Sequence, residues 1–124
     1  MLAITYNPSG SGTEDFYVNG QLVGSASGQY SSSGSTDYWT TYISGAKPSG
    51  VNDYYNSLIG DVQAYSTALT QSQIQTLYNE GITGSPISNA GLISWWKLDN
   101  NTYDSSGNGN NAVGEYITYK QIVA

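Results

Sequence analysis

Residues 58–81 read LIGDVQAYSTALTQSQIQTLYNEG, a strand-like run followed by the one clear helix pattern in the chain. Thr70 can cap this helix, and Gln73, three residues later, can complete a capping box. Gly81 can end the helix because glycine tolerates the left-handed backbone that often follows a last turn. The stretch therefore predicts a short capped helix at about 70–80, directly after a strand.

One face of the predicted helix is apolar. Ile74, Leu77 and Tyr78 recur at spacings of three and four residues, which places them on the same side. A helix this short is marginal in water on its own, so we expect this face to dock on a sheet. The residues expected to face water are Gln71, Gln75 and Asn79.

The rest of the chain has the composition of short strands and turns. Its 124 residues include 12 Tyr, 3 Trp and 15 Gly, but only 10% are charged. Asn19-Gly20 separates FYV from QLV and predicts a two-residue hairpin turn, because both residues tolerate positive φ. The other strand-like runs are LAITY (2–6), YWTTYISG (38–45), LIGDVQAYST (58–67) and LISWWKLD (92–99). We predict an all-β fold of antiparallel strands with one short helix.

Charge and residue usage exclude several classes of function. The net charge is −6, with only three cations, so nucleic acid is not an expected partner. The absence of Cys and His removes thiolate metal sites, the usual zinc ligand and the usual general base. No apolar run approaches the length needed for membrane insertion, and Met1 is not followed by a signal-peptide pattern.

Two segments together resemble one known family. FYVNGQLVGS (16–25) followed by residues 58–81 resembles the latter half of a laminin-G-like, concanavalin A-like jelly-roll domain of the lectin and glucanase type. GLISWWKLDNNTYDSSGNGNNAVGEYITY (91–119) is similar to the first strand and loop of the same family. The resemblance implies an antiparallel jelly-roll β-sandwich.

The two resembling segments stand in reversed order. Residues 1–81 correspond to the C-terminal half of one sandwich, 82–91 to a linker, and 92–124 to the N-terminal strands of a following repeat. A second account is a permuted unit, in which LISWWKLD pairs beside LIGDVQAYST within the same sandwich. We favour a tandem array, because a sandwich without its middle strands exposes apolar surface and unpaired edges.

Aromatic residues in the middle of the chain are candidates for glycan binding, which the resemblance implies as the family's common use. Rigid aromatics among Ser, Gly and Asn are typical of adaptable binding loops. The alternative is that these tyrosines pack in the core or cover sheet edges. The candidate residues are Tyr30, Asp37, Tyr38, Trp39, Asn52, Asp53, Tyr54 and Tyr55.

A polar tract near the C-terminus is a candidate calcium site. Hard cations take oxygen ligands, and five Asp and Asn residues lie close together there, without the spacing of an EF-hand. The alternative is a series of turns whose side chains bond to nearby backbone. No motif requires a cofactor. The candidate ligands are Asp99, Asn101, Asp104, Asn108 and Asn110.

The acidic residues give no sign of an active site. Glycoside hydrolysis normally needs two carboxylates across the scissile bond. The acidic residues weighed for this role, read as solvated surface acids, are Glu14, Asp15, Asp61 and Glu80. Trp95 and Trp96 must point to opposite sides of their strand, so one is expected inside a sandwich and the other near solvent.

The sequence thus predicts a non-catalytic carbohydrate-binding or adhesion module in a multidomain surface or virion protein, with an extracellular location. Its expected partners are a glycan or cell-surface polysaccharide and neighbouring repeats of the same protein. The alternative is a purely structural repeat that makes protein–protein contacts and recognises no sugar.

Overall fold

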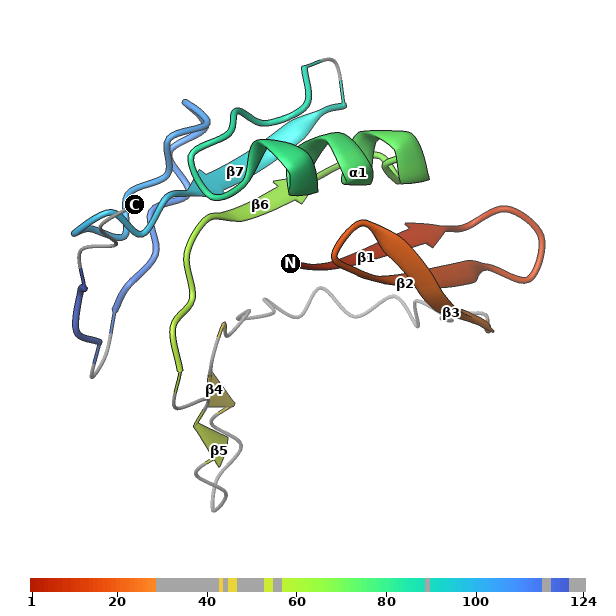
Figure 1. Ribbon diagram of the computed structural model, residues 1–124, viewed down its shortest axis with the longest axis horizontal. Coiled ribbons are helices and arrows are strands. Elements are labelled where there is room, and N and C mark those ends of the chain that lie inside the picture. Colours follow the sequence, from red (N-terminus) through yellow and green to blue (C-terminus); the bar gives the residue numbers. More distant parts are fainter. Residues whose placement is uncertain are drawn as a thin grey trace, which may run out of the picture.

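The computed structural model describes residues 1–28, 43, 45–46, 53–54, 57–88, 90–114 and 117–120. Within these residues the chain is built from antiparallel strand pairs and one helix, which confirms the predicted all-β class. Figure 1 shows α1 (Gln71–Glu80), β6 (Val62–Tyr65) and β7 (Leu92–Trp96) in the upper part of the view, above a three-stranded sheet.

The three-stranded sheet is formed by β1 (Leu2–Asn7), β2 (Thr13–Val18) and β3 (Gln21–Ser27), in that order. The β2–β3 hairpin turns at Asn19 and Gly20, whose φ angles are 49° and 78°. Positive φ at both central residues is the geometry that suits the twist of the flanking strands. The predicted two-residue turn is confirmed.

The helix α1 (Gln71–Glu80) begins at Thr70, whose side chain accepts a hydrogen bond from the Gln73 N–H, while Gln73 closes the capping box. At the other end, the Gly81 N–H donates to the Leu77 carbonyl at 3.1 Å. Both predicted helix signals are confirmed, because each acts within one turn of the chain.

The helix docks on the β2–β3 turn. A Cβ atom at Gly20 would lie 3.3 Å from the Gln75 Cα, so only glycine allows this close approach at a positive φ. Ile74 is fully buried, as predicted. Tyr78 is 43% exposed, but its Cβ also lies against the turn, 3.4 Å from the position of a Cβ at Gly20. Gln75 contacts the same turn, so the expectation that Gln75 faces water was wrong.

The buried core of the described residues is small. It consists of Tyr17 from β2, Ile74 from α1, Ala90 and the side chain of Ser94. Tyr17 and Ile74 precede residues 82–88, and Ala90 and Ser94 follow that segment.

The strands β6 (Val62–Tyr65) and β7 (Leu92–Trp96) pair antiparallel, with Gln63 opposite Trp95. This is the pairing expected of the permuted arrangement, and the division of the chain at 82–91 stays a prediction. Both strands are shorter than the apolar runs suggested. The φ of Asp61 is 57°, a left-handed conformation that cannot continue a strand, so β6 begins only after it.

The sheet formed by β1 and β2 keeps one apolar face exposed. The register places Leu2 beside Val18 and Ile4 beside Phe16, and cross-strand partners share a face. Leu2 is 81% exposed and Ile4 is 68% exposed. Exposed aliphatic residues on neighbouring strands are typical of a surface that another sheet covers.

Candidate functional site

The predicted glycan-binding residues fall mostly outside the described residues. Those outside are Tyr30, Asp37, Tyr38, Trp39, Asn52 and Tyr55. The remaining two form the short strand β5 (Asp53–Tyr54), which pairs with β4 (Gly45–Ala46). The glycan prediction for these loops therefore stays a prediction.

The predicted calcium ligands form an ordered loop centred on Asp104. Its carboxylate accepts four hydrogen bonds: from the backbone N–H groups of Trp95, Ser106 and Asn110, each at 2.9 Å, and from the Ser106 hydroxyl at 2.8 Å. Each oxygen accepts two of them, so the carboxylate organises the turn that follows it.

This loop covers the outer edge of β7. The side-chain amide of Asn108 donates to the carbonyls of Leu92 and Ile93 at 3.0 and 2.8 Å. The amide of Asn110 donates to Ile93 at 3.1 Å and to the buried Ser94 hydroxyl at 3.0 Å. Polar side chains thus occupy acceptors that an unprotected strand edge offers to another chain.

The same hydrogen bonds control the ionisation of Asp104. Burial disfavours its charged form, but the donors from Trp95, Ser106 and Asn110 outweigh that effect and hold its pKa well below the usual range. Asn101 bonds locally to Asp99 and to the Tyr103 N–H. The loop has a structural role in these contacts, and calcium binding there stays a prediction.

A second polar cluster lies at the paired strands β6 and β7, and no sequence motif predicted it. Gln63 and Tyr65 alternate along β6, and Asp61 directly precedes that strand. Hydrogen bonds connect the three side chains, which we call the polar row. Gln63 Nε2 donates to Asp61 Oδ2 at 3.0 Å, and the Tyr65 hydroxyl donates to Gln63 Oε1 at 2.5 Å. From β7, the Trp95 indole donates to Asp61 Oδ1 at 2.5 Å.

The interpretation of Asp61 as a solvated surface acid was wrong. Burial raises its pKa, although hydrogen bonds from Trp95 and Gln63 and the charge of Lys97 act in the opposite direction. Burial also raises the pKa of Tyr65, where the nearby Asp61 charge adds to the effect. The alternation of polar residues at 61, 63 and 65 is the sequence signal that marks this row.

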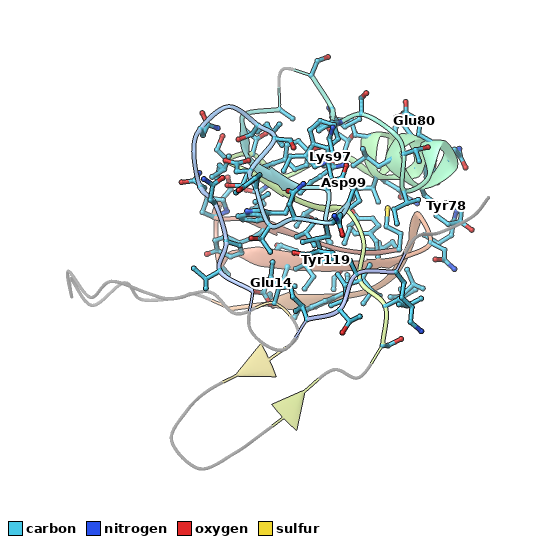
Figure 2. The ribbon with its side chains drawn as sticks, turned by 90° about the vertical axis from the view of Figure 1, so that its left-hand side faces the viewer. Glu14, Tyr78, Glu80, Lys97, Asp99 and Tyr119 are labelled. Atoms are coloured by element: carbon cyan, nitrogen blue, oxygen red, sulfur yellow. The ribbon has the colours of Figure 1, made fainter. Side chains whose placement is uncertain are left out.

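The two tryptophans point to opposite sides of β7, as predicted. The Trp95 indole reaches Asp61, whereas the Trp96 indole donates to the Asn110 carbonyl at 2.8 Å. Both side chains are partly buried, and the expectation that one lies inside a sandwich and the other near solvent stays a prediction. The Lys97 ammonium lies 4.5 Å from the centroid of the Trp95 ring, a cation–π geometry. Figure 2 labels Lys97 and Asp99 after β7.

Other classes of site are limited by what the described residues contain. Among residues 1–28, 57–88, 90–114 and the shorter described segments, no three of His, Cys, Asp and Glu gather as a metal cluster. No helix in this part of the chain is long and apolar enough to cross a membrane.

Comparison with known proteins places the chain in a family. A family model described as the concanavalin A-like lectin/glucanases superfamily matches residues 1–75, which include the three-stranded sheet, β6 and the start of α1. Searches of curated proteins and of solved structures found no match. The predicted resemblance of residues 91–119 lies outside the matched range. Over more than half of its length, the chain belongs to the concanavalin A-like lectin/glucanase superfamily, in its laminin-G-like branch.

Proposed function

We propose that this protein is a non-catalytic carbohydrate-binding module of a larger extracellular, surface or virion protein. The observation that carries the proposal is the superfamily match over residues 1–75, because lectins and glucanases both bind sugars. The clustering of aromatic and hydrogen-bonding side chains on β6 and β7 supports the same function.

The carboxylates favour binding over hydrolysis. A glycosidase holds two carboxyl groups across the scissile bond, and one of them needs a raised pKa. Asp61 has a raised pKa, but its hydrogen-bond partners are Trp95 and Gln63. Asp104 accepts one hydrogen bond from Trp95 of β7 and three from its own loop, and these bonds keep it ionised. Neither arrangement supplies the acid and base pair of a hydrolase.

A glycan screen of the intact chain tests this function. We expect binding that is lost in Trp39→Ala or Tyr55→Ala while the melting temperature stays unchanged. Calcium titration of the same sample tests the loop at 99–110. Failure of the chain to bind any glycan, with or without calcium, contradicts the proposal.

A second candidate function is a structural repeat that packs against neighbouring protein. The exposed apolar face of β1 and β2, with Leu2 81% and Ile4 68% exposed, favours it. Leu2→Ser with Ile4→Ser separates the two functions. A module that works by sugar recognition keeps its glycan affinity in this variant, whereas a packing module loses self-association.

A further inference from the structure

The polar row is held rigidly, although it lies on a small sheet. Asp61 directly precedes β6 and is bonded to Gln63 of β6 and to Trp95 of β7, and Gln63 is bonded to Tyr65. The Tyr65 hydroxyl in turn accepts the Ile87 N–H at 3.0 Å. The carboxylate, the amide and the phenol ring are therefore each held by a neighbouring group. A ligand that binds to side chains already held in place costs less side-chain entropy.

The row keeps hydrogen-bonding capacity beyond its internal bonds. A carboxylate offers about four lone-pair positions and a side-chain amide offers two N–H donors and a carbonyl oxygen. The internal bonds of Asp61 and Gln63 use only part of these. The pair therefore presents an acceptor next to a donor, with the Gln63 amide nitrogen 3.0 Å from an Asp61 carboxylate oxygen. Each hydroxyl of a vicinal diol can both donate and accept, so two adjacent hydroxyls match this pair.

The backbone of Asp61 gives a second, independent indication of function. Its φ of 57° lies in the left-handed region, which Asp and Asn adopt more often than other non-glycine residues, and its carboxylate accepts the hydrogen bond from the Trp95 indole. Backbone strain of this kind clusters at binding and catalytic sites. Asp61 combines it with partial burial and with a hydrogen-bonded aromatic neighbour.

We propose that the polar row, with Trp95 and Lys97 at its border, binds adjacent hydroxyl groups of an uncharged pyranose. In this arrangement Asp61 accepts from one hydroxyl and Gln63 donates to the next, while the Lys97 ammonium is an additional donor at the exposed side. The inference rests on the proposed carbohydrate function and names the site and the sugar class for it.

Charge selects an uncharged sugar over an acidic one. The carboxylate of Asp61 lies within the row, and the whole chain carries a net charge of −6, so a uronate or sulfate is repelled. Lys97 already interacts with the Trp95 ring and with the charge of Asp61, which reduces its value as an anion site. Glucose is therefore expected to bind more tightly than glucuronate, which has the same ring and an added carboxylate.

Nuclear magnetic resonance on the intact chain tests the site directly. Glucose, galactose, mannose, N-acetylglucosamine and glucuronate are added separately, and the Trp95 indole and Gln63 amide signals are followed. A Trp95→Phe sample assigns the indole signal. We expect these two signals to shift with at least one neutral sugar. Gln63→Leu should weaken that binding about tenfold or more, because the bound sugar hydroxyl loses its hydrogen-bond partner. Tyr65→Phe, a smaller change, is expected to weaken it less.

Gln21→Leu is the matched control, because Gln21 is an exposed strand glutamine away from the row. It should leave binding unchanged. Sugar binding that moves neither signal, or that survives both row variants, overturns this inference and leaves the proposed function standing. Tighter binding of glucuronate than of glucose overturns the uncharged class. No binding by any sugar or glycan overturns both.

Discussion

The Trp95 indole donates a hydrogen bond to the Asp61 carboxylate across 34 residues of sequence. The bond lies at the pairing of β6 with β7, the only described strand pair that joins the parts of the chain before and after residues 82–91. The bond therefore links the partly buried Asp61 carboxylate to β7, at the strand pair that joins these two parts of the chain.

The ionisation of Asp61 is expected to weaken the fold as pH rises. Its folded pKa is raised, so the folded state holds the proton more tightly, and stability falls from the unfolded value near 3.8 up through the folded pKa. In Asp61→Asn this loss is absent. The stability of the variant relative to the unchanged protein should therefore increase with pH, as measured by urea unfolding between pH 3 and 7. A difference that shrinks with pH contradicts the prediction.

Asp104 should behave in the opposite way. Its folded pKa is lowered, so the stability it contributes is present above the unfolded value of 3.8 and is lost as pH falls. Asp104→Asn replaces an accepting oxygen with an amide that faces donors, and should destabilise the protein at neutral pH. The stability difference between the variant and the unchanged protein should become smaller as pH falls, in the same series of urea unfolding measurements. Asp99→Asn, at an exposed position whose carboxylate accepts one long hydrogen bond at 3.4 Å, is the control and should destabilise the protein less at neutral pH.

Removal of the helix cap should destabilise the protein modestly. Thr70→Ala removes the acceptor for the Gln73 N–H and is expected to cost about 1 kcal/mol of unfolding free energy. Thr76→Ala, on an exposed position within α1, is the matched control and should be close to neutral. Equal losses in the two variants, measured by thermal unfolding, would show that the cap contributes nothing specific.

Ile74→Ala should be more damaging than any surface truncation. Ile74 is fully buried, and loss of its side chain removes apolar burial and leaves a cavity under α1, at about 2 to 5 kcal/mol. The comparison is Ile82→Ala, because Ile82 is 48% exposed and its truncation should have a small effect. The denaturant midpoints of both variants measure the two losses of stability. A loss in Ile74→Ala no larger than that in Ile82→Ala would mean that α1 does not dock on the rest of the fold.

Gly91→Ala should disrupt the start of β7. The φ of Gly91 is 65°, and a Cβ there meets the Ser66 side chain, next to the bond between the Ser66 N–H and the Gly91 carbonyl. Gly109→Ala shares the positive φ but meets no atom within 4 Å, so it should cost only the backbone strain of about 1 to 2 kcal/mol. Melting temperatures are expected to fall further in the Gly91 variant. The reverse order contradicts the described contact.

The candidate site was less predictable than the fold. The loop at 99–110 was recognised from its Asp and Asn content, but its role at the edge of β7 depends on carbonyls 15 to 17 residues earlier. Asp61 was interpreted as a surface acid because nothing beside it in sequence indicates burial. Its partner Trp95 becomes a neighbour only when β6 and β7 pair.

The sequence by itself determined the elements whose causes lie within one turn of the chain. The cap at Thr70, the end at Gly81 and the turn at Asn19-Gly20 each depend on side chains and glycines within a few residues, so local chemistry specifies them. Only the tertiary structure decided where strands end, which side chains are buried and what Asp61 contacts. Those features depend on contacts between residues distant in sequence, whose free energy exists only after the strands have paired.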